Sequence, residues 1–117
     1  MEEYLARLQK LLRLENWDIT YQEVPTFEQS ARTKMIYNDY RAVVQIKVEN
    51  KIQEKKFSLI HELIHLVFRD AVDEAYSGMK GYAHDNFEKF NERGTEQMAK
   101  VVYFLLEGVP YDPMKTE

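Results

Sequence analysis

The chain contains no cysteine among its 117 residues. This absence excludes disulfides and thiolate metal ligands, and it fits a reducing compartment. The sequence also shows no internal repeat and no low-complexity segment. We therefore expect a single domain over residues 1–117.

A block of basic residues and a long hydrophobic run are missing as well. Lysine and arginine total 16 against 20 aspartates and glutamates, for a net charge of −4, which argues against direct binding to nucleic acid. No apolar run approaches the roughly 20 residues of a membrane span. The N-terminal "MEEYLARLQK" lacks the basic start and continuous apolar core of a signal peptide. We expect a cytoplasmic protein without a membrane anchor.

Apolar residues make up 44% of the chain, which is enough for one thin core. Helical spacing of apolar residues predicts a first helix over 2–14. Alternation predicts a strand over 17–24, ended by Pro25. The polar stretch 26–34 indicates a loop or a poorly formed edge strand. Residues 35–50 then predict two strands, with a tight turn at Asn38–Asp39.

The second half of the sequence predicts helices. A helix over 52–69, capped by Asn50, is apolar almost all round and should be buried. A loop with room for one short helical turn follows over 70–85. A long helix over 86–106 contains Gly94, which could split it, and ends at Gly108 and Pro110. Its expected apolar face consists of Met98, Val101, Val102, Leu105 and Leu106, and residues 111–117 form a tail.

The order of these elements predicts an α+β domain, with the buried helix packed against a small three-stranded sheet. The buried helix contains "FSLIHELIHLVF", residues 57–68. His61 and His65 are four residues apart and therefore project from one face of the helix. Two imidazoles in this arrangement can bind one Zn²⁺, and Glu62 beside them can act as a general base on water. Burial of these polar groups without a partner would cost roughly 2 kcal/mol or more each, and a metal removes that cost.

A catalytic zinc needs a third protein ligand and an open position. Our first choice is Glu96 on the last helix, where the small Ala99 one turn later would let two helices approach. Glu92, one turn earlier, and His84 in the expected loop remain alternatives, and Asp70 and Asp73 are weaker ones. Donors to the oxyanion of a tetrahedral intermediate would come from a further set: His84, Tyr76, Tyr82 and Tyr103.

Over roughly residues 15–107 the sequence resembles the small gluzincin-type metallopeptidases of the ImmA/IrrE group, which are common on phages and mobile elements. The resemblance is carried by "HELIH", by the following helix with "TEQMA", and by the lead-in strands "WDITYQEV" and "RAVVQIKV". It implies a minimal zincin-like domain in which His61, His65 and Glu96 bind one Zn²⁺ and Glu62 is the general base. It also implies a protein substrate, with transcriptional repressors among the candidates.

The sequence departs from that family after Ala99, where Lys100 stands in place of asparagine or aspartate, and it carries no helix-turn-helix domain. SprT-like metalloproteases are a second resemblance. Their third ligand is a loop histidine, and "HDNF" at residues 84–87 would supply it as His84. The acidic, cysteine-free composition favours the first resemblance.

Three functions follow as hypotheses. The first is a zinc-dependent endopeptidase acting on a protein such as a repressor or another regulator. The second is a protein-binding module, an antirepressor or inhibitor, that keeps a zincin fold without catalysis. The third is a structural zinc site, which would need four closed ligands, for example His61, His65, His84 and Glu96.

Overall fold

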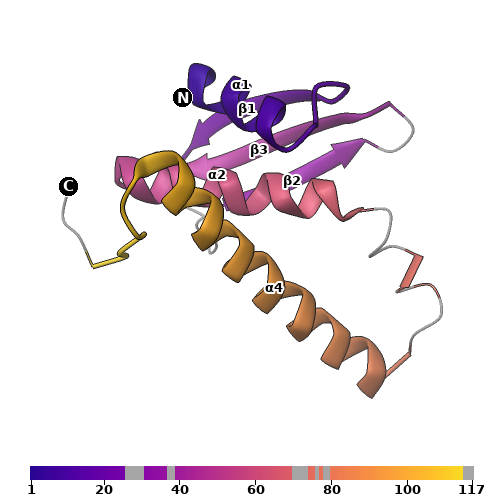
Figure 1. The fold of residues 1–117 in the computed structure, drawn as a ribbon. Coiled ribbons are helices and arrows are strands. Elements are labelled where there is room, and N and C mark those ends of the chain that lie inside the picture. Colours follow the sequence, from indigo (N-terminus) through magenta and orange to yellow (C-terminus); the bar gives the residue numbers. More distant parts are fainter. Residues whose placement is uncertain (26–30, 37–38, 70–73, 76, 78–79, 115–117) are drawn as a thin grey trace.

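A computed structural model describes residues 1–25, 31–36, 39–69, 74–75, 77 and 80–114. The described residues form an α+β fold, as predicted, with three helices and one small mixed sheet (Figure 1). The helices are α1 (Glu2–Leu11), α2 (Ile52–Val67) and α4 (Tyr82–Glu107). The strands are β1 (Asp18–Val24), β2 (Ala31–Ile36) and β3 (Arg41–Lys47).

The sheet has the order β1-β3-β2, so the last strand in sequence lies in the centre. β3 pairs parallel with β1, with Asp18 opposite Arg41, and antiparallel with β2, with Ala31 opposite Ile46. β2 is therefore an edge strand. For residues 31–34 the predicted edge strand is confirmed and the predicted loop is wrong, whereas 26–30 and Asn38 of the expected turn lie outside the described residues.

The core lies between one face of the sheet and two helices, α1 and α2. Alternate residues of β3 (Ala42, Val44 and Ile46) are at most 1% exposed and face this core. The helical spacing predicts an apolar stripe of Tyr4, Leu5, Leu8, Leu11 and Leu12 on the first helix. Tyr4, Leu5 and Leu8 are buried, whereas Leu11 is 50% exposed. The opposite face of the sheet is polar and carries hydrogen bonds of Gln45 with Arg32 and Gln22.

α1 ends three residues before the predicted boundary. Arg13 adopts a left-handed conformation with a φ of 58°, and the chain turns there. The Gln9 side chain donates to the backbone carbonyls of Leu14 and Trp17 at 3.1 and 3.0 Å. These bonds satisfy two backbone carbonyls in the turn that connects α1 to β1.

α2 begins at Ile52 as predicted, but the predicted cap is wrong. The N-cap is Lys51, whose side chain makes no capping hydrogen bond, and Asn50 lies one residue too early. Packing holds this helix in place of a side-chain cap. Its buried residues occupy most of its circumference, as the sequence indicated: Phe57, Ser58, Leu59, Ile60, Leu63, Ile64 and Leu66.

α4 crosses α2 on the side away from the sheet (Figure 1). It begins at Tyr82, four residues before the predicted start, so His84 lies on its first turn and not in a loop. The helix continues through Gly94 without a break and ends at Gly108, whose φ of 77° is the left-handed conformation that glycine adopts readily. Gly94 is thus tolerated inside the helix.

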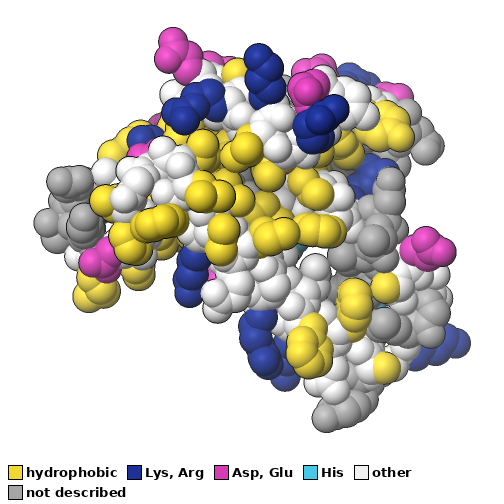
Figure 2. All heavy atoms as spheres, viewed as in Figure 1, with side chains coloured by type: hydrophobic (Ala, Val, Ile, Leu, Met, Phe, Trp, Pro, Cys, Tyr) yellow, Lys and Arg dark blue, Asp and Glu magenta, His cyan; other side chains and the backbone are white. Residues whose placement is uncertain are grey.

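The predicted apolar face of α4 is only partly correct. Its buried residues are Thr95, Ala99, Val102 and Tyr103, whereas Met98, Val101 and Leu105 are 44%, 57% and 71% exposed. Thr95 and Ala99 have small side chains, and α4 can therefore approach α2 closely at these positions. Figure 2 shows hydrophobic side chains gathered over the C-terminal half of α4 and over α2 beside it.

A core substitution on α2 tests this packing. Leu63 is fully buried between the sheet and the helices. Leu63→Ala should lower the free energy of unfolding by about 2 to 5 kcal/mol, because it leaves a cavity. Val67→Ala, at a position 41% exposed on the same helix, should cost less than about 1 kcal/mol. Urea denaturation of both variants measures the difference, and equal losses would contradict the position of Leu63 in the core.

Within the part of the chain that the structure describes, none of the helices combines the length and the apolar character that crossing a membrane requires.

Candidate metal centre

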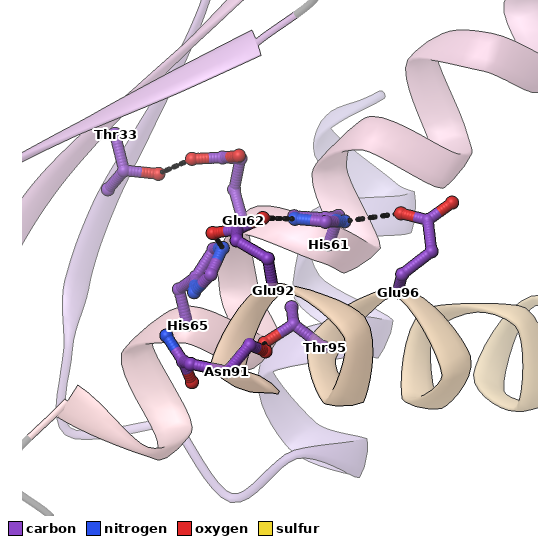
Figure 3. Close-up of polar contacts among 8 residues, drawn as sticks. All are labelled: Thr33, His61, Glu62, His65, Asn91, Glu92, Thr95 and Glu96. Atoms are coloured by element: carbon purple, nitrogen blue, oxygen red, sulfur yellow. Dashed lines mark hydrogen bonds and ion pairs between the residues drawn. The ribbon is translucent and has the colours of Figure 1, made fainter. Parts of the chain in front are cut away.

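α2 carries the motif residues to the side of the helix that meets α4. The rings of His61 and His65 lie 4.9 Å apart between centroids. Their side chains are 17% and 25% exposed, so both are mostly covered yet reachable from solvent. The prediction that they project from one face is confirmed (Figure 3).

α4 places the carboxylate of Glu92 between these two imidazoles. One oxygen, Oε2, lies 3.5 Å from Nε2 of His61, and the other, Oε1, lies 3.2 Å from Nε2 of His65. Among the described residues, these three side chains form a group whose donor atoms all lie within 4.8 Å of one another. Two helices that are distant in sequence thus bring together two imidazoles and one carboxylate, both of which are ligand types suited to zinc.

Glu96 lies on the other side of His61. Its Oε2 is 3.2 Å from Nδ1 of His61, the nitrogen that faces away from Glu92 (Figure 3). The sequence favours Glu96 over Glu92 as the third ligand. The structure brings both glutamates to the site but groups only Glu92 with the two histidines.

The spacing of these ligand atoms is compatible with one metal ion. The two nitrogen–oxygen distances, 3.5 and 3.2 Å, run to different oxygens of the Glu92 carboxylate. One ligand atom from each of the three residues lies within 4.8 Å of the other two. Two imidazoles and one carboxylate are therefore close enough to hold one metal ion.

Glu62 points from α2 towards the sheet. Its Oε1 accepts a hydrogen bond from the hydroxyl of Thr33 on β2 (Figure 3). Because Thr33 is anchored in the sheet, it fixes the direction of the glutamate side chain. Glu62 also lines the same cleft as the two histidines.

The close approach of the helices depends on small residues. Ala99 is fully buried, as the sequence analysis expected of a small residue at this contact, and Thr95 is 4% exposed. The hydroxyl of Thr95 donates to the backbone carbonyl of Asn91 at 2.8 Å, which satisfies it inside the helix. Ala99 and Thr95 each lie within one helical turn of Glu92 or Glu96. The packing of these two small residues therefore sets the distance between α2 and the two carboxylates.

These side chains border a cleft of about 770 Å³ between α2, β2 and α4. The cleft contains the residues described above: Thr33, His61, Glu62, His65, Glu92 and Glu96. Its other walls come from the start of α2, from Glu88 on α4 and from Tyr111 and Pro113 after α4. The candidate metal centre therefore lies in a cleft that is open to solvent.

The remaining candidates from the sequence lie elsewhere. His84 groups with Asp85 and Glu88 on the first turns of α4, separate from His61 and His65. Tyr103 is 2% exposed and belongs to the core, so it cannot donate to a reacting group in the cleft. The others lie outside what the structure describes: Asp70, Asp73 and Tyr76, and the side chain of Tyr82.

Two cleft residues escaped the sequence analysis. Thr33 lies 29 residues before its partner Glu62, in a stretch without a periodic pattern, and no local signal marks it. Tyr111 was assigned to a tail, yet it packs against the core. One signal in the sequence is the position of Tyr111 shortly after Gly108, which ends α4. A hydrophobic residue just beyond a helix end often packs back against the last turn of that helix.

No protein-family model matches the chain, and the search of curated proteins returns no similar sequence. The fold and the site therefore define the protein as a small α+β domain with a candidate two-histidine, one-glutamate metal centre.

Proposed function

We propose that the protein is a zinc-dependent metalloendopeptidase that hydrolyses a peptide bond in a protein substrate. The observation that carries the proposal is the position of Glu92, whose carboxylate lies within 3.5 Å of both imidazole Nε2 atoms in a cleft. Glu62 lies beside them and can serve as a base. This combination is typical of a catalytic zinc site with an open position.

His61, His65 and Glu92 would hold the ion. Glu96 would accept a hydrogen bond from Nδ1 of His61, which fixes the tautomer that leaves Nε2 free to bind metal and makes the imidazole a better ligand. Glu96, which the sequence favours as the third ligand, would then orient His61 and would not bind the metal. Bound zinc would polarise the scissile carbonyl and increase the acidity of a water beside it.

Glu62 would carry the proton. Its carboxylate takes a proton from the attacking water and later delivers it to the leaving amine. Thr33 holds the carboxylate in place throughout, because its hydroxyl donates to the oxygen that faces the sheet. A carboxylate that is held by Thr33 and lines the same cleft as the two histidines suits this role.

An extended peptide suits the shape of the site. Ala31, Arg32 and Thr33 of the edge strand β2 line the cleft. Among the described residues, no strand pairs with the outer edge of β2. A substrate backbone could add to that edge through main-chain hydrogen bonds and would then cross the metal centre. The ImmA/IrrE-like assignment, with a repressor or another regulator as substrate, remains part of this proposal.

Wild-type protein provides the first test. We expect about one zinc ion per chain by elemental analysis, and cleavage of an unfolded protein such as casein that a chelator stops and added zinc restores. A folded wild type that cannot be loaded with zinc would overturn the proposal.

A further inference from the structure

The segment after α4 forms one end wall of the cleft. Beyond Gly108 the chain turns back, and the ring of Tyr111 stacks on Phe57 of α2 with centroids 4.0 Å apart and an angle of 7°. The same ring meets Tyr103 edge to face at 5.3 Å. This aromatic contact, together with Pro113, closes the cleft near the start of α2.

Glu54 lies at the same end of the cleft. It is three residues before Phe57 on α2, so the two side chains lie on neighbouring positions of one helix face. The pKa of Tyr111 is raised, first by burial and then by the negative charge of Glu54. The glutamate carboxylate and the aromatic wall are therefore parts of one environment.

The net negative charge of the cleft favours a positively charged ligand. Five glutamates (54, 62, 88, 92 and 96) and one arginine (Arg32) line it. A bound Zn²⁺ would offset two of the four excess negative charges, which leaves the cleft acidic. Complementary charge steers a basic peptide towards such a cleft and rejects an acidic one.

Distances along α2 indicate which residue of a bound peptide would reach the aromatic wall. Phe57 and Glu54 precede His61 by four and seven residues, which correspond to about 6 and 10 Å along the helix axis. An extended peptide advances about 3.3 Å per residue. A side chain that reaches the aromatic wall would therefore belong to a residue about two or three positions from the scissile bond.

Resting on the proposed peptidase function, we propose that Glu54, Phe57, Tyr111 and Pro113 form a subsite selecting a lysine or arginine about two or three residues from the cleaved bond. The aliphatic part of such a side chain packs on Tyr111, and its charged end reaches Glu54. A leucine or phenylalanine would fill the same space but leave the glutamate carboxylate partly desolvated without a partner.

Peptide binding to zinc-loaded Glu62→Gln, which keeps the ligands, tests the subsite without cleavage. Peptides that differ only by Lys, Leu or Glu at one position are compared by fluorescence polarisation, and the wild type is assayed for cleavage of the same set. We expect Lys to bind about tenfold better than Leu at the matching position. Adding Glu54→Gln should remove that preference, and adding Tyr111→Ala should weaken Lys and Leu peptides alike. Glu88→Gln, the same charge change at another part of the cleft, should keep the preference.

Equal binding of Lys and Leu peptides at every position would overturn the subsite, whether or not the wild type cleaves them. Loss of the preference in Glu88→Gln as large as in Glu54→Gln would also overturn it, because general cleft charge would then be the cause. Selective binding without any cleavage by the zinc-loaded wild type would support the subsite and defeat the peptidase proposal. Circular dichroism and zinc content confirm that each variant is folded and loaded.

Discussion

Glu62→Gln is expected to retain zinc and to lose at least about a hundredfold in kcat/KM, since a positioned general base contributes about 10² to 10⁴. Glutamine has nearly the same shape and keeps an oxygen that can accept the Thr33 hydrogen bond. It cannot take a proton from water. The loss should appear in kcat with little change in KM, because the proton transfer belongs to the transition state. Elemental analysis and peptide hydrolysis on the same preparation measure both quantities.

Thr33→Val is the matched companion of this variant. It keeps the base but removes the hydroxyl that orients it, so activity should fall by about tenfold while zinc content stays unchanged. Full activity in Glu62→Gln would contradict the catalytic role of this residue. If that variant still acted fully on a protein partner while cleaving nothing, a binding module would explain the protein better.

Glu92→Ala is expected to lose zinc, and the loss separates the two glutamates of α4. Glu92 contacts both imidazole Nε2 atoms, whereas Glu96 contacts only Nδ1 of His61. Removal of a residue that merely orients a ligand weakens metal binding about 10- to 100-fold, which we expect for Glu96→Ala. Removal of a ligand should cost more than that. Competition with a fluorescent zinc chelator gives both affinities.

His84→Ala is the control for this pair, because His84 lies in a separate group with Asp85 and Glu88. Its zinc affinity should equal that of the wild type. Stronger loss in Glu96→Ala than in Glu92→Ala would reverse the ligand assignment. Zinc loss in His84→Ala would instead bring back the loop-histidine arrangement of the SprT-like proteases.

The sequence predicts those parts of the site that depend on local geometry. His61 and His65 are four residues apart, and the helical period alone places them on one face. The choice between Glu92 and Glu96 depends on where α4 crosses α2. These glutamates are four residues apart, so a shift of about 6 Å along the helix exchanges them, and no local pattern specifies that shift.

The error on the α4 apolar face has a related cause. Hydrophobicity favoured Met98, Val101 and Leu105, but the helix buries Thr95 and Ala99 against α2. Close packing selects for small side chains at a helix crossing, and a scale of hydrophobicity does not register size. Thr33 and Tyr111 reach the cleft only through the tertiary fold, so sequence spacing could not reveal them.

The burial of α4 is uneven along its length. Between Ala83 and Gly94 no side chain is fully buried, whereas Thr95, Ala99, Val102 and Tyr103 anchor the second half. Two ion pairs between this first half and α2 run from Glu92 to His61 and His65. An ion bound by these three residues would join the two helices at this point. Because a metal that binds only the folded arrangement stabilises it by mass action, zinc would also raise the stability of this helix crossing.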